Sequence, residues 1–182
     1  MDLALYQLTS TAVCDTPAVV TSFDAQAYMG LWYEQFHVKN EYFQKNSWTC
    51  NTAVYSDLTA EGDFGVSNTS ESANQRFNKR FGVSGAGSCP DPTVAACYVA
   101  FFGHGTDYPN YNVIDTDYTT YSVVYTCEAG KSFLWLMARE PNAEQELIDS
   151  MWATAKTALP NFDFSTMAEQ DLQGEKCTYP VV

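Results

Sequence analysis

Short apolar runs alternate with turn-forming residues along most of the chain. Runs rich in aromatic and β-branched residues, separated by Gly, Pro and Asn, are typical of strands, and their spacing is that of a β-sandwich or barrel. Eight such runs suit a closed antiparallel up-and-down barrel, a fold that can hold one small ligand. The predicted strands cover residues 31–38, 48–56, 64–70, 75–83, 94–102, 111–116, 120–127 and 132–138, with glycines at 85 and 87 predicted to interrupt them.

One segment departs from this alternation, because its apolar residues recur at helical spacing. The pattern predicts an amphipathic α-helix over about residues 142–158, ending near Pro160. Asn142 can cap this helix, and Gln145, three residues on, can complete a capping box. A single helix cannot cover both faces of a sheet, so we expect it to pack on the outside of the barrel. Its apolar positions are Leu147, Ile148, Met151, Trp152, Ala155 and Leu159.

The length of 182 residues favours a single domain over residues 1–182. Nine basic and 22 acidic residues give a net charge of −13, which disfavours nucleic acid and anionic membranes as partners. No apolar stretch approaches the ~18 residues of a membrane span. Residues 1–13 lack the features of a secretory signal, so we expect a mature N-terminus.

The six cysteines are spread along the chain without Cys-x-x-Cys spacing. This pattern argues against a zinc site and favours disulfides, so we expect a secreted, extracellular protein without a metal. The sequence alone does not choose among the possible pairings.

Three separated segments together resemble a known family. They are residues 23–34 with Gly30-x-Trp32, residues 115–121 with Asp117-Tyr118, and residues 136–141 with Arg139. In order and spacing they resemble the signature regions of the lipocalins, above all the group of apolipoprotein D, the bilin-binding proteins and the crustacyanins. The resemblance spans about residues 14–177 and implies that these five residues build the closed end of a lipocalin barrel. Arg139 would then lie over the Trp32 ring as a cation–π pair.

The resemblance also implies two disulfides, Cys14–Cys127 and Cys50–Cys177. Cys89 and Cys97 would then pair locally around the turn-prone residues 90–92.

Alternation along each strand, with Trp32 facing inward, predicts the lining of a ligand cavity. Asn68 also begins an Asn-Thr-Ser glycosylation motif, which would require exposure, and the sequence leaves both interpretations open. We favour an inward Asn68. The predicted ligand contacts are Glu34, Phe36, Asn51, Tyr55, Asn68, Tyr111, Tyr125, Phe133, Trp135 and Met137.

Few residues offer catalytic chemistry. His37 and His104 are too separate to form a metal site or a triad and are expected at the open end, on the surface or against a ligand. Basic residues near the mouth could contact an anionic ligand. They are Lys39, Arg76, Lys79 and Arg80.

The resemblance therefore implies a carrier rather than an enzyme, binding a small hydrophobic molecule without covalent attachment. The aromatic content of 15% favours a pigment, either a carotenoid or a biliverdin-like bilin. The alternatives are a fatty-acid or steroid carrier, a lipocalin-type isomerase or peroxide reductase with a free thiolate, and a β-sandwich with a filled core. The sequence also leaves open whether the protein forms a homo- or hetero-oligomer, for which residues 42 and 43 in the first loop are candidate contacts.

Overall fold

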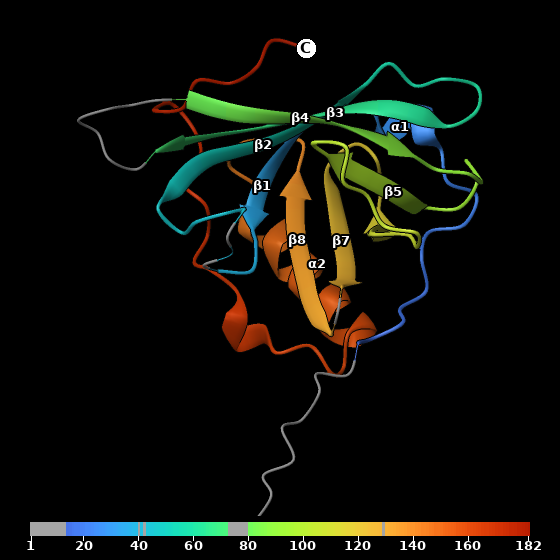
Figure 1. Ribbon diagram of the computed structural model, residues 1–182. Helices are drawn as coiled ribbons and strands as arrows, with labels where there is room; N and C mark the ends of the chain where they lie inside the picture. The colour runs from blue at the N-terminus through green and yellow to red at the C-terminus, as the bar shows by residue number, and fades with distance from the viewer. Residues whose placement is uncertain (1–13, 40, 42, 73–79, 129) are drawn as a thin grey trace, which may run out of the picture.

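The computed structural model describes residues 14–39, 41, 43–72, 80–128 and 130–182. Figure 1 shows strands wrapped into a barrel, with one long helix on its outside. The strands are β1 (Gly30–Phe36), β2 (Trp48–Ser56), β3 (Asp63–Ser72), β4 (Arg80–Ser88), β5 (Ala96–Phe101), β6 (Tyr111–Thr116), β7 (Tyr121–Glu128) and β8 (Lys131–Ala138). The helices are α1 (Ala25–Tyr28), α2 (Gln145–Ala158) and the 3₁₀ helix η2 (Phe164–Thr166).

Each strand pairs antiparallel with the next, and β1 pairs with β8 to close the barrel. Closure pairs every strand with a neighbour on both sides, which explains how short strands with many turns form a stable unit. The predicted eight-stranded up-and-down barrel with one external C-terminal helix is thus confirmed.

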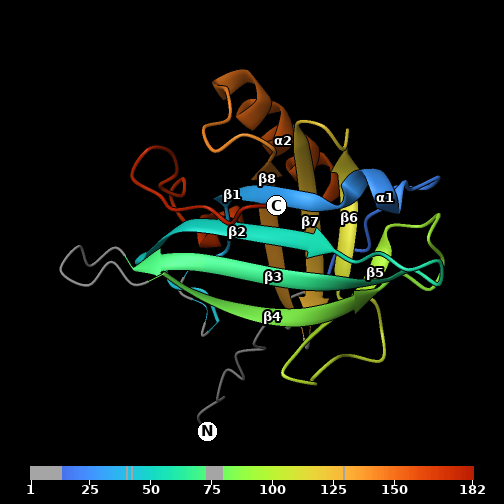
Figure 2. The ribbon, with the colours of Figure 1, turned by 90° about the horizontal axis from the view of Figure 1, so that it is seen from above.

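The helix α2 lies against β7 and its neighbours on the outer face, as the view from above shows (Figure 2). Its apolar stripe packs with outward side chains of the strands in a second apolar cluster, separate from the barrel interior. The helix begins at Gln145, so the predicted capping box is wrong. Gln145 donates to Asp149 instead (2.8 Å), and Asn142 packs beside Gly174 of the C-terminal segment.

The glycines at 85 and 87 were expected to lie between strands, but both lie within β4. Part of the predicted strand 75–83 lies outside the described residues. A Cβ on Gly87 would lie 2.2 Å from the Phe64 ring, and one on Gly85 would lie 2.4 Å from the Ala100 carbonyl oxygen. Glycine is needed at both positions because a neighbouring ring or strand approaches the backbone closely.

The closed end of the barrel is built around Trp32, which is fully buried. Its indole Nε1 donates to the Tyr28 carbonyl (3.0 Å), and the Arg139 guanidinium lies 3.6 Å from the ring centroid. Gly30 has φ +98°, and a Cβ there would lie 3.4 Å from the Arg139 Nη1. The cation–π pair expected from the sequence is therefore present.

A tight turn before β7 supports this end. The Asp117 carboxylate accepts hydrogen bonds from the backbone N–H groups of Thr119, Thr120 and Tyr121 (2.7–3.1 Å). The Tyr118 carbonyl accepts from Arg139 Nε (2.9 Å). The turn and the arginine thus hold each other in place.

All six cysteines are joined in disulfides, with the three pairings that were expected. They are Cys14–Cys127, Cys50–Cys177 and Cys89–Cys97.

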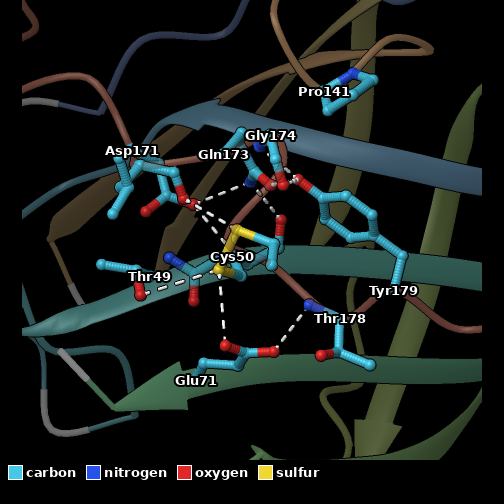
Figure 3. The surroundings of a disulfide bond; sticks show 12 residues. Thr49, Cys50, Glu71, Pro141, Asp171, Gln173, Gly174, Thr178 and Tyr179 are labelled. Atoms are coloured by element: carbon cyan, nitrogen blue, oxygen red, sulfur yellow. Dashed lines mark hydrogen bonds between the residues drawn. A yellow bond between two sulfur atoms is a disulfide. The ribbon is translucent and has the colours of Figure 1, made fainter. Parts of the chain in front are cut away.

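The C-terminal segment, residues 167–182, fills a gap in the barrel wall. β1 and β2 pair only between Gly30–Tyr33 and residues 52–55. Beyond that point the backbone of Asp171 donates to Gln35 (2.8 Å) and that of Leu172 accepts from Cys50 (2.9 Å). The Cys50–Cys177 bridge fixes this arrangement, and Glu71 of β3 accepts from the Thr178 backbone N–H (2.8 Å; Figure 3).

Candidate ligand-binding site

Cross-strand partners show which side chains face the interior. Trp32 is opposite Ala53, which is opposite Asn68, and Trp135 is opposite Val124. Directly opposed residues share a face of the sheet. The predicted contacts that lie on the inner face are Glu34, Asn51, Tyr55, Asn68, Tyr111, Phe133, Trp135 and Met137.

Phe36 does not face the interior, so its predicted orientation is wrong. The β1–β8 register shifts between Glu34 and Phe36, and this bulge reverses the alternation. The Phe36 ring packs edge-on against Trp152 of α2, with 5.0 Å between centroids. Phe36 therefore anchors the helix.

Tyr125 also faces outward, contrary to the prediction. It is opposite Asn112, whereas the inward Tyr111 is the neighbour of Asn112 in β6, so Tyr111 and Tyr125 cannot share a face. The Tyr125 hydroxyl accepts from the Asp15 backbone N–H (3.1 Å), and its ring lies near Phe162 (6.5 Å).

Three tyrosines form the floor of the interior. The Tyr28 hydroxyl is hydrogen-bonded to those of Tyr111 and Ser122 (2.8 Å each), and Tyr55 donates to Tyr111 (2.7 Å). Burial raises the pKa of Tyr28 to about 12 and those of Tyr55 and Tyr111 well above their usual value. These hydroxyls stay neutral and partner one another, so the floor offers mainly ring surface.

Aromatic rings continue toward the open end. Phe133 and Trp135 are stacked, with 6.1 Å between centroids and 16° between planes, and Phe43 lies 5.4 Å from Phe133. Across the opening, Trp48 packs against Phe81 (4.6 Å). The upper interior is thus a surface of aromatic faces.

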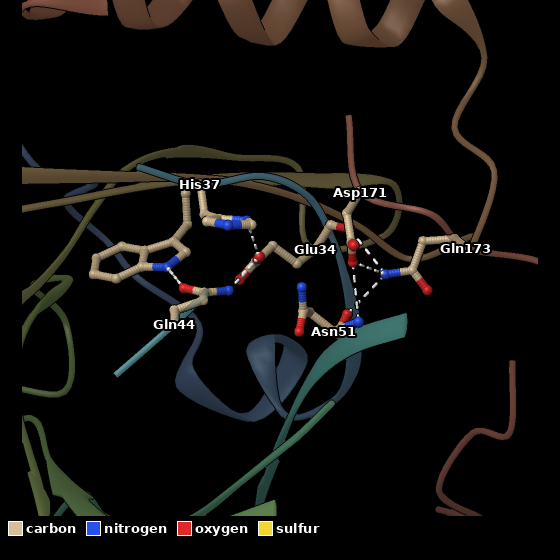
Figure 4. A network of polar contacts seen from close by, with 7 residues as sticks. Glu34, His37, Gln44, Asn51, Asp171 and Gln173 are labelled. Atoms are coloured by element: carbon tan, nitrogen blue, oxygen red, sulfur yellow. Dashed lines mark hydrogen bonds and ion pairs between the residues drawn. The ribbon is translucent and has the colours of Figure 1, made fainter. Parts of the chain in front are cut away.

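A polar network lies beside these rings (Figure 4). Gln44, from the loop between β1 and β2, donates to Glu34 Oε1 (2.5 Å) and accepts from Trp135 Nε1 (3.2 Å). His37 Nδ1 lies 2.7 Å from the same Glu34 oxygen, close enough for an ion pair but not aligned as a hydrogen bond. The Gln44 side chain thus occupies the space between a ring and a carboxylate inside the barrel.

The C-terminal segment adds a second carboxyl group to this region. Asp171 Oδ2 accepts from the Asn51 backbone N–H (2.9 Å) and from Gln173 Nε2 (2.8 Å). Burial and the nearby Glu34 carboxylate raise the pKa of Asp171 to about 8. Burial opposes the charged form of His37, but Glu34 outweighs it and the pKa of His37 is raised. Near neutral pH Asp171 is therefore mainly protonated.

Replacing Asp171 with asparagine is expected to change how stability depends on pH. The folded-state pKa lies above the unfolded value of 3.8, so the folded protein binds more protons and its unfolding free energy falls as the pH rises from about 4 to 8. Asp171→Asn keeps an oxygen acceptor and removes this titration. We expect the variant to be more stable than the native protein by at least about 2 kcal/mol at pH 8, with little difference at pH 4, in urea unfolding.

The matched control is Asp149→Asn on the exposed face of α2, which should shift stability little at either pH. An Asp171→Asn effect of equal size at pH 4 and pH 8 would contradict the assignment.

Several buried polar atoms on the inner face have no hydrogen-bond partner among the described residues. Asn51 is 3% exposed, and neither its Oδ1 nor its Nδ2 is paired. His37 Nε2, Asn68 Oδ1 and Thr126 Oγ1 are likewise unpaired. Because an unpaired buried polar group is costly, these atoms point to a further binding partner.

The histidines and basic residues match the expected positions only in part. His37 is buried rather than on the surface, whereas His104 is in an exposed loop. Lys39 donates to the Ser165 carbonyl (2.7 Å) beside η2, and Arg80 Nη2 lies 3.5 Å from Thr69 Oγ1. The two remaining predicted basic positions, 76 and 79, lie outside the described residues.

Five site residues were missed by the sequence analysis. Alternation along the strands could have identified Trp48 of β2 and Phe81 of β4 as inward residues. The other three residues belong to a loop and to the C-terminal segment, where no strand periodicity indicates which side chains reach the interior. The missed residues are Gln44, Trp48, Phe81, Asp171 and Gln173.

A hollow of about 500 Å³ lies elsewhere, along β3, β4 and β5, and opens to solvent. Its lining includes Ala86, Tyr98 and Ala100, which alternate with inward residues and so belong to the outer face. Within the described ranges, no three His, Cys, Asp or Glu side chains gather as a metal site would require. No helix in the described part of the chain has the length and apolar character to cross a membrane.

Comparisons with known proteins agree with this architecture. A family model for the lipocalin-like domain matches residues 23–170. Outer membrane lipoprotein Blc of Citrobacter freundii is 33% identical over 138 residues, covering 75% of this chain and 73% of its own. Apolipoprotein D of Mus musculus is 30% identical over 140 residues, covering 74% and 70%.

Solved structures show the same fold at low sequence identity. Insecticyanin from the tobacco hornworm Manduca sexta superposes with a TM-score of 0.71 at 19% identity, covering 92% of this chain and 90% of its own. Lobster apocrustacyanin A1 gives a TM-score of 0.64 at 17% identity, with 90% and 93% covered.

Proposed function

Because the chain belongs to the lipocalin family, we propose that it is a carrier that holds one small apolar molecule inside its barrel and does no chemistry on it. The observation that carries this proposal is the inner face itself, where the stacked rings of Phe133 and Trp135 stand beside buried polar atoms that lack partners. A dry, filled core would not leave Asn51 unpaired. A ligand with an apolar body and a polar end would pack its body against these rings and form hydrogen bonds with the unpaired polar atoms.

Entry of a ligand would require the loop between β1 and β2 to move. Gln44 reaches from this loop to Glu34 and Trp135, so its side chain stands where a ligand would lie (Figure 4). Phe43 of the same loop covers Phe133. Loop opening would expose the rings to the ligand, and burial of its apolar surface would drive binding at roughly 25 cal/mol per Å² before ordering costs.

The ligand we favour is a pigment, a carotenoid or a biliverdin-like bilin. Flat conjugated molecules stack on aromatic faces, and Phe133 and Trp135 present nearly parallel rings. The resemblance to the bilin-binding proteins and crustacyanins also supports a pigment. Among the described candidate basic contacts for a bilin, Lys39 bonds beside η2, and Arg80 is opposite Glu71 on the outer face of the sheet, so a carotenoid is the better fit to the described residues.

Other features bear on the alternatives. An enzyme acting through a free thiolate has no support, since every cysteine is in a disulfide. Three disulfides fit an oxidising compartment, so we propose that the protein is secreted. A fatty-acid or steroid ligand would bind at the same inner face and is distinguished by analysis of the bound molecule.

The test combines ligand identification with Trp135→Ala. The protein is isolated from its native source, and the bound molecule is extracted, identified by mass and visible spectrum, and titrated into native and variant protein. We expect a coloured extract and binding to Trp135→Ala weakened by about 10-fold or more, because the main stacking surface is lost.

Trp152→Ala is the matched control, because it removes an indole of α2 that packs against Phe36 on the outside of the barrel. It should lower stability without changing ligand affinity. A colourless lipid extract would overturn the pigment assignment and leave the carrier, whereas equal binding losses in both variants would overturn the interior site.

A further inference from the structure

A group that lies between Trp135 and Glu34 must accept a hydrogen bond from the first and donate one to the second. At present Gln44 supplies both, donating to the Glu34 carboxylate and accepting from the Trp135 indole N–H (2.5 and 3.2 Å). Gln44 is half-buried and reaches in from a loop, whereas its two partners belong to β1 and β8. The strands thus offer one acceptor and one donor to whatever enters.

The side chain of Asn51 in β2 also needs a partner that both donates and accepts a hydrogen bond. Its backbone N–H and carbonyl are bonded to Asp171 and to Gln173 (2.9 and 2.8 Å), which fixes the main chain. The amide is directed to the side of Glu34 and Gln44 (Figure 4), and both of its polar atoms are unpaired. A side chain that is 3% exposed, with its amide NH2 group and its carbonyl oxygen both unpaired, is suited to a small polar group that can donate and accept.

We propose that Glu34, Asn51 and Trp135 form a site for the uncharged hydroxyl end of an apolar ligand, with Gln44 occupying that site in the ligand's absence. This proposal rests on the carrier function and names the chemical class of the ligand. A hydroxyl donates one hydrogen bond and accepts others, so it satisfies either half of the site. The apolar body of the ligand would then lie along Phe133 and Trp135.

Charged end groups fit this site poorly. A ligand carboxylate would join Glu34 and Asp171 beside one imidazole, that of His37, and would meet no further cation among the described interior residues. A ligand ammonium could donate to Glu34, but it cannot accept from the N–H groups of Asn51 and Trp135, and it would approach His37. Both arrangements leave a buried charge or donor unpaired. We therefore expect the site to bind charged ligands much more weakly than an uncharged alcohol.

The test uses four probes with the same chain and different ends: 1-dodecanol, dodecanoate, dodecylamine and dodecane, each below its solubility or micelle limit. Isothermal titration calorimetry on the native protein should show dodecanol binding at least about 10-fold more tightly than the other three. In Asn51→Leu this preference should fall to about 3-fold or less, because the amide no longer meets the hydroxyl. Asn112→Leu, on the outer face opposite Tyr125, should keep the full preference.

The outcomes separate this proposal from the carrier function. Equal binding of dodecanol and dodecane, tighter binding of the acid or the amine, or an unchanged preference in Asn51→Leu would overturn the hydroxyl site and leave the carrier in place. Failure of all four probes to bind would overturn both. If Asn51→Leu does not fold, the comparison of the four probes on the native protein still decides.

Discussion

Replacing Arg139 with methionine is expected to lower the free energy of unfolding by about 4 kcal/mol, because one side chain holds the closed end together. Its guanidinium donates to the main-chain carbonyls of Tyr118, Leu31, Ala27, Tyr28 and Met29, at 2.8–3.1 Å. It also covers the Trp32 ring, and methionine would fill part of the volume without supplying any of these donors.

Arg139→Lys provides an intermediate case, since lysine keeps the charge but lacks the planar fork that reaches several carbonyls at once. Arg80→Met is the matched control at the open end, where the guanidinium makes a 3.5 Å contact with Thr69, and should cost less than about 1 kcal/mol. Urea unfolding followed by tryptophan fluorescence measures all three. A loss below about 1 kcal/mol in Arg139→Met would show that the closed end does not depend on this residue.

Removing the Cys50–Cys177 disulfide should have a similarly large effect. The bridge joins residues 127 apart in the sequence, whereas Cys89–Cys97 joins residues 8 apart. Loop-closure entropy predicts a loss of about 5 kcal/mol for the long bridge and about 3 kcal/mol for the short one. The double variants Cys50→Ala/Cys177→Ala and Cys89→Ala/Cys97→Ala are compared by thermal and urea unfolding.

The long bridge also holds the C-terminal segment between β1 and β2, so its loss should speed proteolysis of residues after 167 while the short-bridge variant resists cleavage there. Equal destabilisation by the two pairs of substitutions, with no difference in cleavage, would show that neither loop length nor the held segment matters.

The strand pattern and the closed end could be predicted because they depend on local or family-wide constraints. Alternation in β8 correctly oriented Phe133, Trp135 and Met137, since that strand pairs with β7 without a register shift. The partnership of Trp32 with Arg139 followed from the resemblance of the three separated segments to the lipocalin signature regions, and the structure brings the two residues together.

The interior could be predicted only in part, because single register shifts and distant segments determine it. The bulge after Glu34 turned Phe36 outward, and nothing in the alternation of apolar residues marks that point. Gln44 and Asp171 enter from a loop and from the C-terminal segment, and their positions depend on the tertiary fold rather than on local pattern. The polar part of the candidate site is therefore the part that strand alternation in the sequence predicts least well.

The insertion of residues 171–173 between β1 and β2 has a consequence for the order in which the protein can be assembled. Strand β1 is synthesised before the other seven strands, yet the gap beside it is filled only by residues made more than 100 positions later, as the contact of Asp171 with Gln35 shows. A nascent chain that has completed all eight strands still has an open seam beside Cys50. Contacts so distant in sequence form slowly, so sealing of this seam is expected to be a late step of folding.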